Sequence, residues 1–294
     1  MNTTALLIGL GPLLGWGLYP TIASKFGGRP VNQILGSTVG TLIFAIIFAN
    51  IKGLAMPSGM NLWFSILSGI GWASAQIITF KAFTMVGSSR AMPITTAFQL
   101  LGASLWGVFA LGDWPGVSDK VFGGLALVLI IIGASLTVWS EHKDAGNARL
   151  LRNAVLWLAV GEIGYWAYSA APQATNISGM QAFVPQAIGM VIVSVIYAIV
   201  LAARGEKLAL VEGISYKHII SGFFFAFAAL TYLISAQPNM NGLATGFILS
   251  QTSVVLATLT GIWFLGQKKT AKEMGITILG LVLILAAATV TVLI

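Results

Sequence analysis

The sequence contains no cysteine and little charge, and both absences exclude broad classes of protein. Without cysteine there is no disulfide framework and no thiolate metal site. Only 8% of the residues are charged and 57% are hydrophobic, whereas about 25% are charged in a soluble domain. Long apolar runs with short polar breaks predict a helical membrane protein, since barrel strands show roughly ten residues of alternating polarity.

Residues that carry catalytic or metal chemistry are also scarce. The two histidines, His142 and His218, fall in polar breaks, and the sequence has neither an HExxH motif nor an intramembrane pair of aspartates. We therefore expect no enzyme, no metal and no cofactor. The net charge of +7 does not predict nucleic-acid binding, because the lysines and arginines lie at the ends of apolar runs.

Ten apolar runs have about the length that spans a bilayer, and they predict an all-α membrane protein with ten transmembrane helices. No lysine or arginine precedes Lys25, so the first run is expected to be a span rather than a signal peptide. The runs cover residues 4–24, 31–51, 60–80, 88–111, 119–140, 153–172, 179–203, 216–236, 242–265 and 270–294.

Basic residues are distributed unevenly between the breaks. The breaks after the odd-numbered runs hold 13 of the 15 lysines and arginines, and the other breaks hold only Lys52 and Lys120. The positive-inside rule then predicts that the odd breaks are cytoplasmic and that both termini lie outside a cell membrane.

The polar segment 141–152 divides the chain into two halves with five runs each, residues 1–140 and 153–294. The halves resemble each other weakly, as FALGDW at 109–114 and WFLGQK at 263–268 illustrate. An odd number of spans in each half requires that the halves insert in opposite orientations. We therefore expect two inverted five-helix repeats with a cytoplasmic linker, a construction common in secondary transporters.

Glu162 is the one acid deep inside an apolar run, and the functional hypothesis starts from this residue. A helix rises about 1.5 Å per residue, which puts Glu162 about 14 Å from the start of its run, near the bilayer midplane. Carrying a charge there costs a few kcal/mol, and such acids mark ion or substrate paths. Glu162 is therefore the expected proton site, although a structural acid tied to a neighbouring helix remains an alternative.

Other polar and aromatic residues at similar depth predict a pocket for a neutral polar solute. Amides and hydroxyls bind a polyol, aromatic faces cover its C–H surface, and the deep runs have no lysine or arginine for an anion. The same residues could instead hold helices together. The candidates are Trp16, Tyr19, Trp72, Gln76, Thr96, Gln99, Tyr165, Trp166, Ser250 and Gln251.

Three long strings resemble the glucose/ribose porter family of the drug/metabolite transporter superfamily. They are GLGPLLGWGLYPTIASKFGGRPVNQILG (9–36), VGSSRAMPITTAFQLLGASLWGVFALGDWPG (86–116) and AQPNMNGLATGFILSQTSVVLATLTG (236–261). The resemblance implies ten spans in two inverted repeats, sugar uptake with ribose as the first expectation, and coupling to protons. In this superfamily the cavity is lined by the first four helices of each repeat, which selects runs 1–4 and 6–9. Small multidrug transporters of the superfamily use a glutamate in their first helix for proton coupling. Glu162 lies in the first helix of the second repeat, so the analogy fits there. The first helix of the first repeat has Gly11 and Pro12 near the matching place and no acid.

The function expected is import of a neutral sugar by proton symport, with loosened helices near Pro93 and Pro185 letting one repeat rock against the other. Glucose or another neutral solute, export instead of import, a passive facilitator and a membrane-embedded sensor are the alternatives. The expected partners are sugar, protons and the lipid bilayer, and the oligomeric state is left open.

Overall fold

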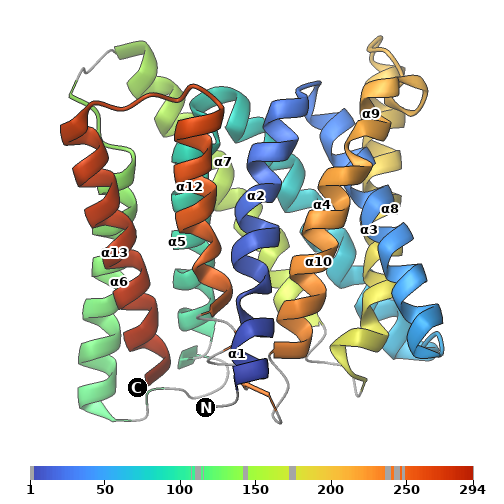
Figure 1. The fold of residues 1–294 in the computed structure, drawn as a ribbon, viewed down its shortest axis with the longest axis horizontal. Helices are drawn as coiled ribbons and strands as arrows, with labels where there is room; N and C mark the ends of the chain where they lie inside the picture. Colours follow the sequence, from blue (N-terminus) through green and yellow to red (C-terminus); the bar gives the residue numbers. More distant parts are fainter. Residues whose placement is uncertain are drawn as a thin grey trace.

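The structure is a computed structural model that describes residues 3–106, 108–109, 114, 116–141, 145–171, 177–235, 240–241, 246 and 249–293. Over this part of the chain the protein is a bundle of helices whose axes run roughly side by side (Figure 1). In chain order the helices are α1 (Thr3–Gly9), α2 (Gly11–Phe26), α3 (Pro30–Lys52), α4 (Gly59–Val86), α5 (Ser88–Trp106), α6 (Val117–Thr137), α7 (Ala145–Ala170), α8 (Gly179–Ala203), η3 (Ala209–Val211), α9 (Gly213–Lys217), α10 (Ile219–Ser235), α12 (Ser253–Phe264) and α13 (Ala271–Leu293).

Each of the ten apolar runs corresponds to a helical segment of the described chain, with the first run divided into α1 and α2 and the eighth into α9 and α10. Seven of these segments are long and apolar enough to cross a membrane. The segments of α5 and α7 fall short because polar and aromatic residues lower their mean hydropathy, and the ninth run forms a shorter helix over Leu249–Phe264. His142 and parts of the fourth, sixth and ninth runs and of the linker lie outside the described residues.

One expected helix boundary is wrong. Helix α4 continues six residues beyond the end of the third run and stops at Gly87, whose φ of 79° favours glycine and whose N–H donates to the Phe83 carbonyl (2.9 Å). Helix α5 begins at Ser88, as the fourth run does. The helices α5 and α8 both continue through their internal prolines, Pro93 and Pro185.

Contacts between the two halves of the chain dominate the packing. Helix α4 packs against α7 and α8, while α10 of the other half packs against α2 and α3. Helices α3 and α8 pack against each other, and α6 pairs with α13 at one edge of the bundle (Figure 1). The two halves are therefore interleaved, and neither forms a separate body.

Glycines allow these helices to cross at close range. A β-carbon on Gly69 of α4 would lie 1.8 Å from the Gln186 carbonyl oxygen of α8, and one on Gly189 of α8 would lie 2.2 Å from the Ile66 carbonyl oxygen of α4. Gly40 of α3 and Gly222 of α10 form a second crossing of this kind. Small residues let helices approach closely in a membrane, where packing replaces the hydrophobic effect as the source of stability.

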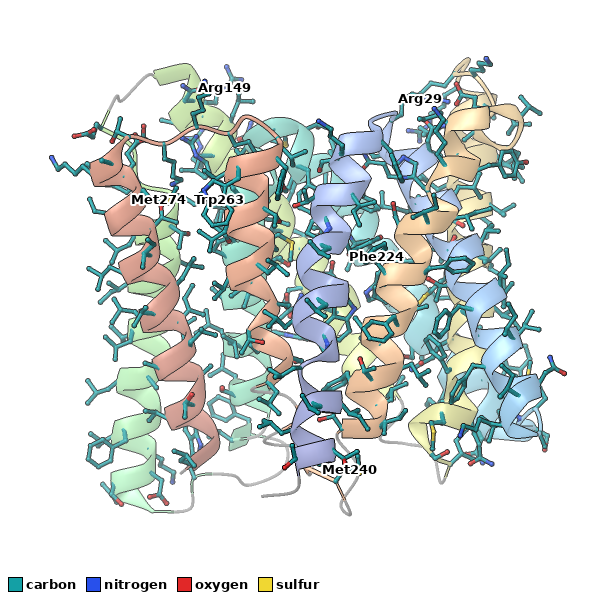
Figure 2. The ribbon with its side chains drawn as sticks, in the orientation of Figure 1. Arg29, Arg149, Phe224, Met240, Trp263 and Met274 are labelled. Atoms are coloured by element: carbon teal, nitrogen blue, oxygen red, sulfur yellow. The ribbon has the colours of Figure 1, made fainter. Side chains whose placement is uncertain are left out.

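Charged side chains connect helices at one end of the bundle. This end carries Arg29 and Arg149 in Figure 2, and we call it the basic end. The Arg29 guanidinium, between α2 and α3, forms salt bridges with Glu206 and Glu212, between α8 and α9. The Asn32 amide also donates to Glu212 (2.8 Å). We call these four residues the Arg29 clamp. His218, placed by the sequence in a polar break, is fully buried beside it, with Nε2 3.0 Å from the Gly27 carbonyl oxygen.

Replacement of Arg29 by glutamine is expected to lower the melting temperature of the purified protein by a few degrees, because it leaves two carboxylates without their cation. The Asn32 amide and the Arg29 guanidinium hold the pKa of Glu212 below its usual value. The clamp therefore contributes stability above the ordinary glutamate pKa, and this contribution is lost as the pH falls through the lowered value. Thermal unfolding at pH 7 and pH 4 measures both effects.

The matched control is Arg149→Gln. Arg149 is exposed and forms no salt bridge with any described carboxylate. Equal melting temperatures for the two variants at pH 7 would show that the clamp adds nothing beyond a surface charge.

Candidate functional site

Glu162 points into the bundle. Its side chain is 4% exposed, and both carboxyl oxygens are buried without a hydrogen-bond partner among the described residues. The Trp166 indole, one turn further along α7, lies near the carboxyl group, but not in a geometry that completes a hydrogen bond. A buried carboxyl group without fixed partners is free to exchange a proton with water or a ligand that reaches it.

Gln76 and Tyr165 meet between α4 and α7. The Tyr165 hydroxyl donates to Gln76 Oε1 (2.9 Å) and lies 3.0 Å from Thr79 Oγ1. All three side chains are buried. These contacts join α4 to α7. The sequence named Gln76 and Tyr165 separately, and the structure joins them.

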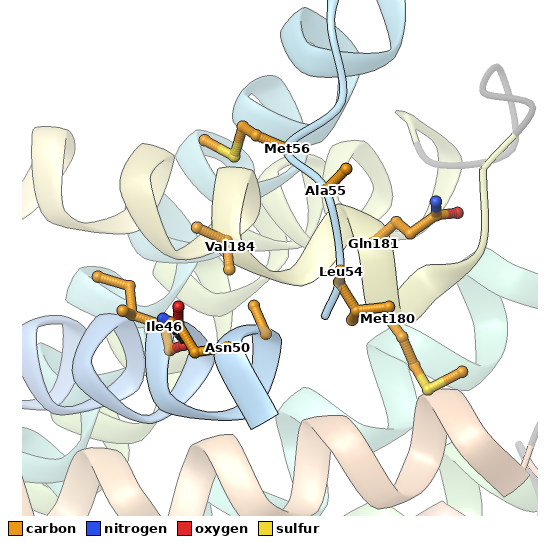
Figure 3. A pocket seen from close by; sticks show the side chains of 9 residues that line it. Ile46, Asn50, Leu54, Ala55, Met56, Met180, Gln181 and Val184 are labelled. Atoms are coloured by element: carbon orange, nitrogen blue, oxygen red, sulfur yellow. Dashed lines mark hydrogen bonds between the residues drawn. The ribbon is translucent and has the colours of Figure 1, made fainter. Parts of the chain in front are cut away.

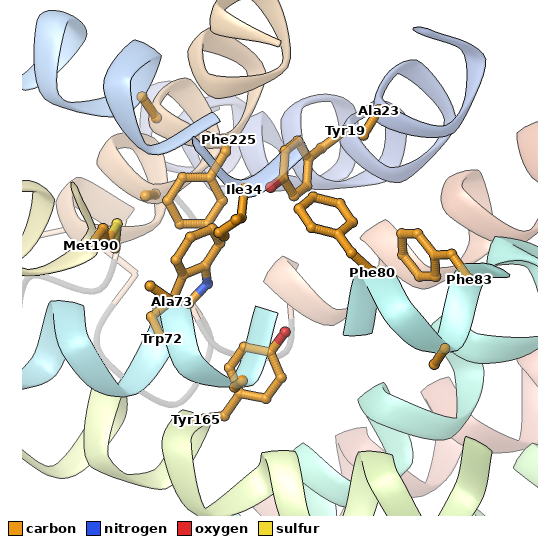
Figure 4. Close-up of a cluster of buried hydrophobic side chains, with 14 of the residues drawn as sticks. Tyr19, Ala23, Ile34, Trp72, Ala73, Phe80, Phe83, Tyr165, Met190 and Phe225 are labelled. Atoms are coloured by element: carbon orange, nitrogen blue, oxygen red, sulfur yellow. The ribbon is translucent and has the colours of Figure 1, made fainter. Parts of the chain in front are cut away.

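Tyr19 and Trp72 lie beside Phe225 of α10 (Figure 4), and the Trp16 ring also contacts Phe225. The Trp72 ring centroid lies 4.0 Å from that of Phe225, and those of Tyr19 and Trp16 lie 5.7 and 6.3 Å away. Trp16 Nε1 and the Tyr19 hydroxyl are buried without a hydrogen-bond partner among the residues that the structure describes. The result is an aromatic cluster that carries two unused hydrogen-bonding groups.

The remaining predicted residues lie on α5, α7 and the ninth segment. Thr96 is buried and Gln99 half-buried. Ser250 and Gln251 are both buried, and Gln251 Nε2 donates to Ser250 Oγ (3.2 Å). Trp166 differs, because its side chain is 45% exposed and its indole lies against Gly102 of α5.

Sequence reasoning did not select several further residues of this region. Ser37 of α3, Thr95 of α5 and Thr258 of α12 each bury a hydroxyl that has no described partner. A hydroxyl group in an apolar helix is a weak indication of a binding site, because most such hydroxyl groups serve packing between helices. Nothing in the sequence distinguishes Phe225 from the other apolar residues of α10.

Unpaired buried polar groups are the shared feature of this region. Leaving one unsatisfied costs about 1–3 kcal/mol, so native proteins pair nearly all of them with protein, water or ligand. Here six such side chains lie on α2, α3, α5, α7 and α12, and among these helices α2 contacts α12, α12 contacts α5, and α5 contacts α7. We define the central polar cluster by these residues: Trp16, Tyr19, Ser37, Thr95, Glu162 and Thr258. The chemistry of the cluster suits a neutral molecule with several hydroxyl groups.

Two cavities lie elsewhere in the described structure. One of about 150 Å³ lies between the end of α3, residues 54–56 and the start of α8, and is lined by Asn50, Met56 and Gln181 among others (Figure 3). The other, of about 320 Å³, lies at the basic end between the α4–α5 turn and residues 266–269. Neither is lined by a predicted site residue.

No group of three or more histidine, aspartate or glutamate side chains that could hold a metal is found among the residues the structure describes. The central polar cluster contains one acid, and Glu162 alone offers too few ligands for a divalent ion.

Comparison with known proteins gives consistent results over the whole chain. A family model described as "Sugar transport protein" matches residues 7–294. A protein of Lactiplantibacillus plantarum named "Putative ribose uptake protein RbsU" is 88% identical over 99% of both chains. Proteins with the same name from Enterococcus faecalis and Staphylococcus epidermidis are 76% and 72% identical, over 100% and 99% of both chains.

A solved structure titled "Crystal structure of protein" superposes with a TM-score of 0.66, covering 98% of this chain and 99% of its own. The two sequences share 17% identity. At this level the likeness concerns the arrangement of helices alone.

Proposed function

The chain belongs to the sugar transport protein family, and from this premise we propose that it imports ribose together with protons. It is a multi-pass membrane protein and a sugar transporter. Ribose is the proposed sugar because the relatives carry that name, and because the central polar cluster offers hydroxyl and indole groups with no lysine or arginine among them. No catalytic chemistry is proposed.

The sugar site proposed lies around the central polar cluster, and its unpaired buried groups are the observation that carries the proposal. Trp16, Tyr19 and Trp72 would cover the C–H face of the sugar, as aromatic side chains do in ligand pockets. The other proposed contacts are Gln76, Thr96, Gln99, Tyr165, Trp166, Ser250 and Gln251. Hydroxyl groups of the sugar would then satisfy groups that the protein itself leaves unpaired.

Proton coupling is assigned to Glu162. Its carboxyl group is buried without a partner among the described residues, and it lies on the same helix as Tyr165, whose hydroxyl donates to Gln76 of α4. Sugar binding beside Glu162 changes the environment of the carboxyl group, so loading of the proton and of the sugar become linked.

The two halves, residues 1–140 and 153–294 with the linker between them, are proposed to be inverted repeats. The interhelical contacts support this, because they fall into matching pairs. The contact of α4 with α8 corresponds to that of α10 with α3, and the contact of α4 with α7 to that of α10 with α2. The glycine crossings follow the same rule: Gly69 with Gly189, and Gly222 with Gly40. Rocking of one repeat against the other would open the central polar cluster.

The basic end is proposed to face the cytoplasm of a cell membrane, because it gathers most of the lysines and arginines. Helix α1 and the end of α13 lie at the opposite end of the bundle (Figure 1), so the proposed orientation has both termini outside.

Uptake of labelled sugars into proteoliposomes, with and without an imposed inward proton gradient, tests this function. We expect ribose to accumulate above its equilibrium level only with the gradient. Equal ribose entry in both conditions would identify a passive facilitator, preferential accumulation of glucose would change the substrate, and no uptake of any sugar would overturn the proposal.

Replacement of Gln99 or Gln251 by alanine is expected to raise the KM for ribose about tenfold, the effect of losing one or two hydrogen bonds worth roughly 1.4 kcal/mol together. Gln181→Ala is the control, because the Gln181 side chain takes part in the N-terminal cap of α8, where its Oε1 accepts the Ser178 N–H (3.1 Å), away from the central polar cluster. An unchanged KM in both test variants would assign Gln99 and Gln251 to helix packing.

A further inference from the structure

The larger cavity, at the basic end, is built from two distant parts of the chain. Its walls are the α4–α5 turn with Arg90 on one side and the residues that link α12 to α13 on the other. A hydrogen bond ties the two walls together, since the Ser89 N–H donates to Gln267 Oε1 (2.9 Å). At about 320 Å³ the cavity falls within the usual size of ligand pockets, roughly 300–1,000 Å³.

Positive charge dominates the lining. Arg90, Lys268 and Lys269 all line the cavity, and none of them forms a salt bridge with a carboxylate in the described part of the chain. Lysines at the ends of spans ordinarily serve topology and extend into solvent. Here, however, Arg90 of α5 and Lys269 of the segment between α12 and α13 are partly buried and line the same cavity.

Backbone N–H groups add to this charge, because the cavity lies at the N-terminus of α5. The first N–H groups of a helix lack partners within the helix and attract anions. In α5 the Ser89 N–H is instead paired with the amide oxygen of Gln267. A neutral oxygen thus occupies a position that an oxygen of an anion would fill more strongly.

We propose that this basic cavity binds the phosphate group of an anionic ligand. Arg90 supplies a planar guanidinium that bonds two phosphate oxygens, and Lys268 and Lys269 supply point charges. Phosphate displaces the Gln267 amide from Ser89 and joins the two walls. The site lies away from the central polar cluster, and binding of phosphate there does not depend on which sugar is transported.

The charge on Lys269 makes this binding sensitive to pH. Burial and the neighbouring Arg90 lower the pKa of Lys269 to about 8, against a smaller opposing effect from Glu273 of α13. The Lys269 ammonium also donates to the Thr137 carbonyl at the end of α6 (2.7 Å). As the pH rises through about 8 the site loses one of its three charges, so affinity for phosphate falls.

Thermal unfolding of the full-length protein in nanodiscs of neutral lipid tests the proposal, with inorganic phosphate and ribose 5-phosphate as probes and chloride at equal ionic strength as the reference. We expect saturable stabilisation at pH 7, with at least tenfold weaker binding in Arg90→Gln combined with Lys268→Gln, and weaker binding at pH 9. Lys217→Gln, which removes an exposed lysine at the same end, should bind as the wild type does.

A second variant distinguishes loss of phosphate binding from loss of folding. Gln267→Glu places a carboxylate at the Ser89 N–H and is expected to abolish phosphate binding while leaving the melting temperature unchanged or higher. A second set of nanodiscs containing phosphatidylglycerol identifies the source of the phosphate. Stabilisation only by this lipid, lost in the same variants, would assign the cavity to a headgroup. No stabilisation by either source, or stabilisation that the variants retain, would overturn the proposal.

Discussion

Replacement of Glu162 by glutamine is expected to abolish uphill accumulation of sugar in proteoliposomes under a proton gradient while sparing exchange of internal for external sugar. Glutamine has nearly the same shape and fills the same buried space, but it neither takes up nor releases a proton. Exchange needs only the sugar site and the movement of the loaded carrier, so it persists. Accumulation of labelled ribose and ribose counterflow, measured on the same vesicles, separate the two steps.

The matched control for this experiment is Glu141→Gln. Glu141 lies at the basic end, where its carboxylate pairs with Lys272 and accepts a hydrogen bond from Thr270. This variant is expected to accumulate ribose as the wild type does. Full proton-driven accumulation by Glu162→Gln would remove Glu162 from the coupling mechanism, whatever its role in the sugar site.

A single methyl group at Gly69 is expected to have the largest effect on stability. In Gly69→Ala the new β-carbon would overlap the Gln186 carbonyl oxygen, because the two would lie 1.8 Å apart, so α4 and α8 must separate. Overpacking of this kind typically costs about 1–3 kcal/mol, and more where the obstacle is backbone. We expect most of the protein to be lost to aggregation on purification, as size-exclusion chromatography in detergent would show.

The same substitution at Gly124 provides the control, since a β-carbon there meets no atom within 4 Å. Alanine favours a helix over glycine by about 0.8–1.0 kcal/mol, so Gly124→Ala should be as stable as the wild type or slightly more so. The inverted-repeat proposal adds that Gly222→Ala, at the corresponding crossing of α10 with α3, should behave like Gly69→Ala. Wild-type stability in Gly69→Ala would contradict the close α4–α8 crossing.

The number of helices could be predicted from the sequence because the bilayer imposes one dominant requirement, an apolar run of spanning length. Local signals located most helix ends, such as Gly53 after α3, with φ of 61°. These local signals gave the wrong helix end where a charged residue lies inside an otherwise apolar helix. Lys81 ended the third run in the sequence, yet α4 passes through it to Val86 and stops at Gly87.

The sequence predicted individual residues of the site but not which of them contact each other. Depth along a run gave the burial of Glu162, because an acid at mid-helix is stable only if it faces protein. Pairings such as Tyr165 with Gln76 depend on the rotation of α4 and α7, and a helix that is apolar on all sides does not encode its rotation. For the same reason the exposure of Trp166, the burial of His218 and the central place of Phe225 came only from the structure.

Proton movement driven by sugar alone tests the central claim most directly. Proteoliposomes that contain a trapped pH-sensitive dye, with no imposed gradient, are given ribose on the outside. The wild type is expected to acidify the vesicle interior as ribose enters, and Glu162→Gln is expected to leave the internal pH constant. Ribose entry into wild-type vesicles without acidification would contradict coupling through the buried acid.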